Sequence, residues 1–153
     1  MRSDSGDVLD VQRRPSRVSM SGLSPVSLLV EENKALVRKL VHCVNEHDAD
    51  ELDEIAEGRF ARLARRWISP FESAFPDFHM EIVNLVGEGD TVVAHFKCSG
   101  THEGEWLGVA PTGRRFENVD EIYIFQVKNG KLSAAIGVED NLTRIRHLGL
   151  RPL

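Results

Sequence analysis

Hydrophobic residues recur every three or four positions through the first half of the chain, which predicts helices. The first helix begins at Ser24-Pro25, a capping serine followed by proline at the first helical position. Its apolar residues lie on one face of a helix of about five turns: Leu29, Leu36, Leu40, Val41 and Val44. Asp48 and Glu51 then predict a capping box for a short second helix that ends near Ala56.

A third helix follows Gly58 and ends before Pro76. Its apolar face consists of Phe60, Leu63, Ala64, Trp67, Ile68, Phe71 and Phe75. Pro70 lies inside this pattern and removes a backbone hydrogen-bond donor, so a kink or a division of the helix is expected there.

Beyond Pro76 the period of the hydrophobic pattern changes to two, which predicts strands. The expected strands are residues 79–86, 91–100, 115–128 and 131–138. Residues 87–90 predict one hairpin turn, and Asn129-Gly130 predicts a second turn of type I′. Asp140 or Asn141 caps a short last helix. Helices followed by an antiparallel meander predict an α+β fold with the helices on one face of the sheet.

The chain of 153 residues is 41% hydrophobic, which predicts one domain with a tail. Residues 1–24 contain six serines, two glycines and a proline, and offer too little apolar surface to order themselves. We therefore expect a disordered tail over residues 1–24 and a folded domain over residues 25–153.

Charge and residue spacing exclude several classes of protein. The net charge of −5 argues against binding to nucleic acid. There is no run of the roughly 20 apolar residues that would span a membrane. Cys43 and Cys98 are expected to be reduced thiols in the cytoplasm, and the six histidines lack metal-ligand spacing.

Several short motifs occur in a fixed order along the folded part. They are Ala74-Phe75-Pro76-Asp77, Gly87-Glu88-Gly89-Asp90, Gly100-Thr101-His102, residues 108–116 (GVAPTGRRF), residues 128–132 (KNGKL), Asp140 and residues 146–149 (RHLG). With these motifs the segment from about Glu32 to Leu150 resembles the SnoaL-like polyketide cyclase family of the NTF2-like superfamily. The resemblance implies a cone, in which three helices close a curved antiparallel sheet around an apolar pocket. It also implies cyclisation of polyketide esters by aldol addition, without metal or cofactor.

The catalytic residues of that family are not reproduced here. The position of the family's aspartate base is occupied by Gly137, and the positions of its glutamine and histidine are occupied by Glu121 and Tyr123. A segment after Ala56 that carries the family's asparagine is absent. The resemblance therefore implies the scaffold without the family's catalytic set.

Glu121, Tyr123 and Phe125 share one face of their strand, since side chains alternate along a strand. If this face lines the pocket, burial would raise the pKa of Glu121 and make it a general acid or base, with Tyr123 as hydrogen-bond donor. The alternative is that Glu121 is solvated and Tyr123 is part of the core. Asp120, next to Glu121, is expected on the opposite, exposed face, unless a bulge at Asn118-Val119 inverts the register of the strand.

Three residues outside that strand are further candidates. His102 either orients a ligand carbonyl or forms a structural hydrogen bond to the loop of residues 103–113. Trp106, in that loop, is a candidate to cover the pocket. Trp67, in the third helix, either lines the pocket or belongs to the core.

Two functions remain open on the sequence alone. The first is a cofactor-independent enzyme that acts by proton transfer on a small apolar carbonyl or ester compound, with Glu121 as base and Tyr123 or His102 as donor. The second is a non-catalytic ligand-binding or dimerisation module on the same scaffold. Ile122 and Ile124 face away from the predicted pocket, which predicts a homodimer or higher homo-oligomer formed through the sheet.

Overall fold

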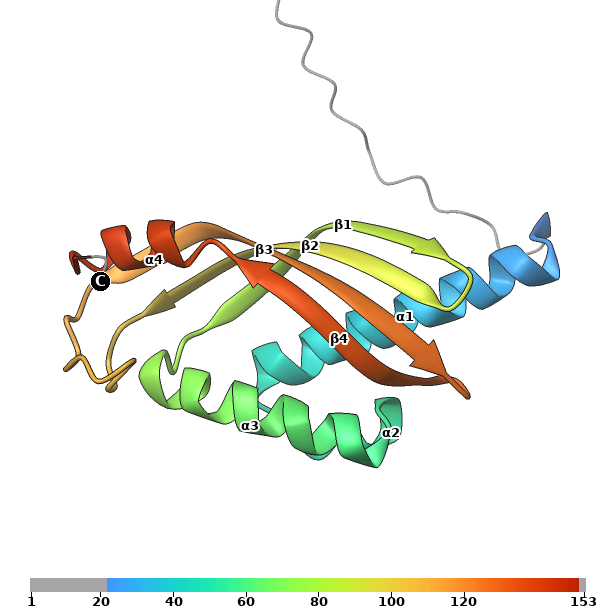
Figure 1. Ribbon diagram of the computed structural model, residues 1–153, viewed down its shortest axis with the longest axis horizontal. Helices are drawn as coiled ribbons and strands as arrows, with labels where there is room; N and C mark the ends of the chain where they lie inside the picture. Colours follow the sequence, from blue (N-terminus) through green and yellow to red (C-terminus); the bar gives the residue numbers. More distant parts are fainter. Residues whose placement is uncertain (1–21, 152–153) are drawn as a thin grey trace, which may run out of the picture.

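The structure is a computed structural model that describes residues 22–151 (Figure 1). Residues 1–21 of the expected tail lie outside the described part. The elements are α1 Pro25–Glu46, α2 Leu52–Ile55, α3 Gly58–Ala74, β1 His79–Glu88, β2 Thr91–Thr101, β3 Arg115–Lys128, β4 Lys131–Glu139 and α4 Asn141–His147. The described chain is therefore α+β, with three helices before the strands and one after them.

The helix boundaries follow local hydrogen bonding. The Ser24 hydroxyl accepts the N–H of Ser27 at 3.2 Å, so the predicted start of α1 is confirmed. The Asp48 carboxylate accepts the N–H groups of Asp50 and Glu51 in the turn before α2, which is one half of the predicted capping box. The Glu51 side chain accepts from the Cys43 thiol instead of the Asp48 N–H, and α2 begins only at Leu52.

α3 is one continuous helix with Pro70 inside it, so the expected division at Pro70 does not occur. Pro70 itself is exposed, while Ile68 and Ala74 on either side of it are buried. Burial of the apolar face thus keeps the helix intact despite the loss of one backbone hydrogen bond.

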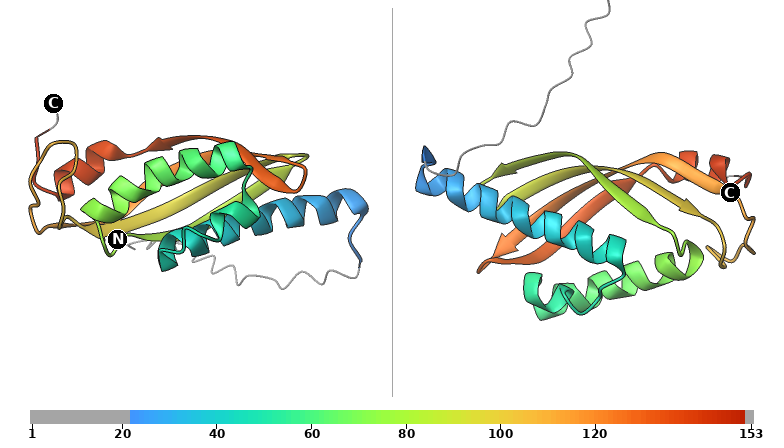
Figure 2. Two further views of the ribbon diagram at one scale, coloured as in Figure 1. Left: turned by 90° about the horizontal axis from the view of Figure 1, so that it is seen from below. Right: turned by 180° about the vertical axis from the view of Figure 1, so that it is seen from behind.

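The four strands form one antiparallel sheet in the order β1-β2-β3-β4. Asn129 and Gly130 have φ angles of 51° and 70°, which confirms the predicted type I′ turn between β3 and β4. The sheet twists and curves over the helices, as both views in Figure 2 show.

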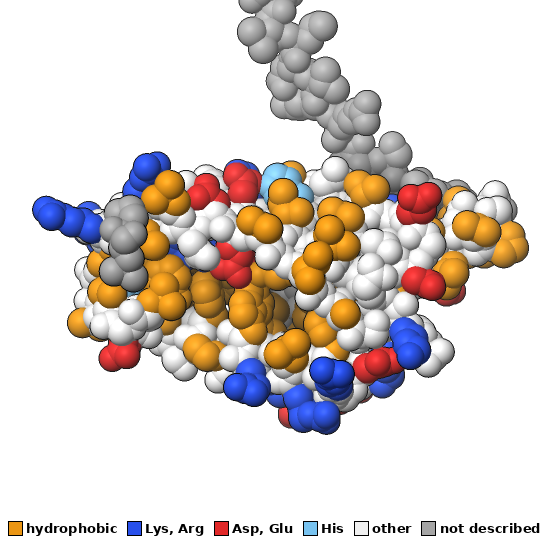
Figure 3. All heavy atoms as spheres, viewed as in Figure 1, with side chains coloured by type: hydrophobic (Ala, Val, Ile, Leu, Met, Phe, Trp, Pro, Cys, Tyr) orange, Lys and Arg blue, Asp and Glu red, His pale blue; other side chains and the backbone are white. Residues whose placement is uncertain are grey.

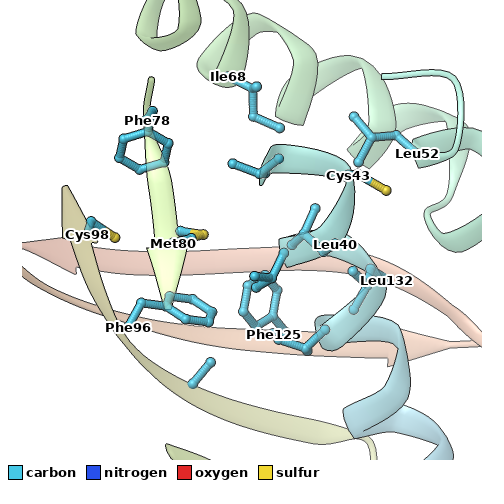
Figure 4. Close-up of a cluster of buried hydrophobic side chains, with 14 of the residues drawn as sticks. Leu40, Cys43, Leu52, Ile68, Phe78, Met80, Phe96, Cys98, Phe125 and Leu132 are labelled. Carbon is cyan, nitrogen blue, oxygen red and sulfur yellow. The ribbon is translucent and has the colours of Figure 1, made fainter. Parts of the chain in front are cut away.

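The helices α1, α2 and α3 cover the concave face of the sheet, and the core lies between these layers (Figure 1). Figure 4 shows Leu40 of α1 beside Phe125, with Met80 and Phe96 on the neighbouring strands and Ile68 of α3 on the helical side of the cluster. Two cysteines, Cys43 and Cys98, belong to the same buried cluster and are free thiols.

α4 follows β4 directly and packs against β3. The Asp140 carboxylate accepts the N–H of Thr143 at 3.0 Å, so Asp140 caps this helix as predicted. Within residues 22–151, no helix is long and apolar enough to cross a membrane.

Candidate functional site

A cavity of about 330 Å³ lies between the helices and the concave face of the sheet. Its wall is formed mainly by apolar side chains of α1, α3 and the strands, and Glu139 is the one charged residue among the described residues that line it. Figure 3 shows a hollow lined by hydrophobic side chains where α3 approaches the sheet. The volume lies at the lower end of the range usual for small-molecule sites.

Two polar groups meet on the wall of this cavity. The Tyr123 hydroxyl donates a hydrogen bond to Glu139 Oε1 at 2.8 Å. Tyr123 is the partner of Gly137 across the β3–β4 pair, and Glu139 follows Gly137 by two residues, so all three lie on the same face of the sheet. The Glu139 side chain is 14% exposed.

Arg144 of α4 binds the other oxygen of the Glu139 carboxylate. Its Nη1 donates to Glu139 Oε2 at 2.9 Å, and its Nη2 donates to Glu121 Oε1. The Arg144 side chain is fully buried, and its guanidinium carbon lies 4.9 Å from the ring centres of Phe71 and Phe116. One buried cation is therefore shared by two carboxylates and stabilised by aromatic faces.

Glu121 is buried, with 1% of its side chain exposed, so the alternative of a solvated Glu121 is wrong. It faces Glu139 across the β3–β4 pair but does not line the cavity. Burial raises the pKa of Glu121 to about 7, the charge of Arg144 opposes this shift, and the charge of Glu139 adds to it.

A bulge sets which side chains of β3 face inward. The β2–β3 register shifts between Cys98 and Gly100, opposite Asn118, whose φ is 54°. Beyond it Glu121 points to the interior. Asp120 points outward, where Lys97 and His95 hold the pKa of its carboxyl below the usual value.

His102 is fully buried and anchors the loop that follows it. Its Nδ1 accepts the backbone N–H of Thr112 at 3.2 Å, so the proton of a neutral ring is on Nε2. His102 is not among the residues that line the cavity, and its position matches the structural one of its two predicted roles.

The three aromatic residues expected at the pocket separate into two groups. Trp67 and Phe125 line the cavity, and Trp67 is 39% exposed rather than enclosed in the core. Trp106 does not line it. It packs edge-on against Phe71 and Phe75, next to the guanidinium of Arg144.

Sequence reasoning missed both Glu139 and Arg144. The signal for Glu139 was its spacing of two residues from Gly137, which places both on one strand face. In α4 the apolar Leu142 is 44% exposed, whereas the charged Arg144 is fully buried, which is the reverse of what the residue types suggest. Within residues 22–151, no group of three His, Cys, Asp or Glu side chains is arranged to hold a metal ion.

Several solved structures share this fold. TsrD from Streptomyces laurentii is 26% identical with a TM-score of 0.74, over 85% of this chain and 100% of that one. AclR from Streptomyces galilaeus is 24% identical with a TM-score of 0.72, over 81% and 85% of the two chains. IdmH from Streptomyces antibioticus is 24% identical with a TM-score of 0.67, over 77% and 99%. A comparison with curated protein sequences finds no match.

The helices and the curved, unclosed antiparallel sheet therefore define an α+β protein with the NTF2-like fold, as the sequence predicts. The model of the SnoaL-like polyketide cyclases matches residues 34–148, and the chain belongs to that family.

Proposed function

We propose that the cavity binds a small, uncharged, mainly apolar compound that carries a carbonyl or ester group. The apolar wall favours such a ligand, and none of the described residues on the wall is cationic and able to receive an anionic one. Tyr123 and Glu139 are adjacent there, so a hydroxyl donor and a carboxylate acceptor would meet the polar end of the ligand.

We further propose that the protein catalyses proton transfer, with Glu139 as the base. Glu121 was the sequence-based candidate for this role, but its carboxylate is buried behind the wall and bonded to Arg144. Glu139 lies on the wall, two residues beyond Gly137 and on the same face of β4.

The proposed reaction begins when the Tyr123 hydroxyl turns from Glu139 Oε1 to the carbonyl oxygen of the ligand. The freed carboxylate then removes a proton from the carbon next to the carbonyl. The C–H bond breaks and its electron pair forms a C=C bond to the carbonyl carbon, while the π pair of the C=O bond moves onto the oxygen. Glu139 carries the proton, and the enolate oxygen accepts the Tyr123 hydrogen bond. Burial raises the pKa of Tyr123, which favours the hydroxyl form needed for donation.

The observation that carries this proposal is the hydrogen-bonded pair of Tyr123 and Glu139 on an otherwise apolar wall. The cyclase-type fold supports it, because the chemistry of polyketide cyclisation begins with loss of such a proton.

The binding part of the proposal can be tested with 2-tetralone, a bicyclic ketone, and tetralin, the corresponding hydrocarbon. An NMR titration that follows the amide signal of Gly137 reports binding at the wall. We expect both compounds to bind, and Tyr123→Phe to weaken binding of 2-tetralone by roughly three- to tenfold, the loss of one hydrogen bond, with tetralin unaffected. No response of the Gly137 signal to either compound would contradict the proposed ligand class.

A further inference from the structure

Three arginines form a stripe on the exposed face of α3, beside the mouth of the cavity. Arg59, Arg62 and Arg66 recur every three or four residues, so their side chains lie on one side of the helix, and all three are exposed. Among the described residues none of the three has a hydrogen-bond or ion-pair partner, whereas Arg65 of the same helix binds Asp53. Figure 3 shows Lys and Arg side chains gathered below the hydrophobic hollow, along the edge that α3 forms in Figure 1. A chain of net charge −5 therefore carries a local positive surface at this helix.

Two apolar side chains lie next to the arginine stripe, where the cavity opens. Leu63 and Trp67 of α3 line the cavity, yet they are 61% and 39% exposed. Gly137, on the β4 side of the opening, also lines the cavity, is exposed and adds no charge. The mouth of the cavity is thus flanked by an indole ring, a leucine side chain and three guanidinium groups.

We propose that this face of α3 binds the surface of an anionic lipid bilayer and holds the mouth of the cavity against it. Arginine binds phosphate groups through its planar set of donors, and each cationic side chain near an anionic bilayer strengthens binding roughly fivefold. Tryptophan and leucine favour the boundary between headgroups and acyl chains. The inference goes beyond the proposed function, because it concerns an outer surface and not the polar pair on the cavity wall.

The apolar side chains favour a bilayer over an acidic protein as the occupant of this face. A contact made by charge alone would leave Leu63 and Trp67 in water, whereas a bilayer offers phosphates and an apolar layer at adjacent depths. An uncharged, mainly apolar ligand is also more soluble in a bilayer than in water, so a mouth held against lipid would receive it directly.

The acidic side chains around α3 compensate the arginine stripe only in part. Glu72 is the one acidic residue of α3, and it lies 3.3 Å from His47 of α1. Asp53 of α2 binds Arg65 through both of its oxygens. Glu57 precedes the first turn of α3, where the helix dipole stabilises a carboxylate. Charges more than about 10 Å away are largely screened at physiological salt, so the net negative charge of the chain opposes binding through this face only weakly.

The test is flotation of the full chain, without ligand, with two kinds of vesicle. One contains phosphatidylcholine alone, and the other contains equal parts of phosphatidylcholine and phosphatidylglycerol. We expect binding to the anionic vesicles in about 0.05 M salt, its loss in about 0.5 M salt, and little binding to phosphatidylcholine alone.

Two triple variants compare the arginine stripe with the charge of the whole chain. The first should bind the anionic vesicles roughly 100-fold more weakly than wild type; it carries Arg59→Gln, Arg62→Gln and Arg66→Gln. The second makes the same change in net charge at exposed positions outside α3, and should bind within about threefold of wild type; it carries Arg38→Gln, Lys39→Gln and Arg146→Gln.

Quenching of tryptophan fluorescence by lipids with brominated acyl chains tests the orientation. The chain has two tryptophans, and Trp106 is buried. We expect quenching in wild type and its loss in Trp67→Phe. Absence of binding to anionic vesicles at low salt, equal binding by the two triple variants, or absence of quenching in wild type would each overturn the inference. Binding to poly-L-glutamate but not to the vesicles would also overturn it, and would identify an acidic protein as the partner. Because no ligand is used, failure of the proposed function would leave this result intact, and the reverse also holds.

Discussion

The ring of Tyr123 lies directly over the α-carbon of Gly137, its partner across β3 and β4. A β-carbon at position 137 would overlap three ring atoms of Tyr123: Cδ1, Cε1 and Cζ. A side chain at 137 and the present tyrosine position therefore exclude each other. The ring of Tyr123 thus fills the space that a side chain at position 137 would occupy.

Gly137→Ala should therefore destabilise the protein by about 1–3 kcal/mol, because the tyrosine ring must move and its bond to Glu139 is strained or lost. Urea unfolding measures this change. In a Tyr123→Val background the same substitution should cost much less, since the ring is absent. If Gly137→Ala lowers the free energy of unfolding equally in the two backgrounds, the Tyr123 ring is not the reason that position 137 requires glycine.

Arg144→Met should be strongly destabilising, by about 3–5 kcal/mol, because it leaves two buried carboxylates without their cation. Arg146→Met is the matched control in the same helix, at an exposed position, and should change stability by less than about 0.5 kcal/mol. The cost of Arg144→Met should fall when Glu121 is already glutamine, since one buried charge is then gone. Additive costs in the double variant would contradict the shared pairing.

The stability of the protein should decrease as pH rises from about 5 to 8. Burial raises the pKa of Glu121 from 4.5 to about 7, so the folded protein holds a proton that the unfolded chain releases in this window. The shift corresponds to at most about 3 kcal/mol. Glu121→Gln should remove this dependence and gain stability relative to wild type as pH rises, as measured by urea unfolding at several pH values. If the difference in free energy of unfolding between Glu121→Gln and wild type is the same from pH 5 to 8, the raised pKa of Glu121 is contradicted.

Exposed apolar side chains on the outer face of the sheet lead us to expect self-association. Ile136 and Val138 of β4 are 71% and 76% exposed, and lie opposite Ile124 and Ile122 of β3. Burial of these side chains between two sheets would remove them from water. We expect light scattering at micromolar concentration to give twice the chain mass of 17.1 kDa. Ile136→Lys should shift the protein toward monomer, and Val26→Lys, on exposed α1, should not. A wild-type mass of 17.1 kDa would refute this prediction.

The sequence predicts the fold of this protein better than its site. Both ends of β3 are predicted correctly. Asn129-Gly130 is a strong local signal for the turn that ends the strand, and apolar and polar residues alternate over the whole strand before it. The inward position of Tyr123 follows from the same alternation. The burial of Arg144 does not follow from local pattern, because it depends on how α4 docks against β3 and on two carboxylates from different strands.

The most direct test of the proposed chemistry is deuterium uptake by 2-tetralone in D₂O, at the carbon between the carbonyl and the aromatic ring, followed by proton NMR. Wild type should exchange this position faster than buffer alone. Glu139→Gln should slow the protein-catalysed rate by about 10²- to 10⁴-fold, and Glu81→Gln, at an exposed position on β1, should leave it unchanged. Binding of 2-tetralone without faster exchange would favour a ligand-binding module instead. Exchange that survives in Glu139→Gln would contradict the assignment of Glu139 as the base.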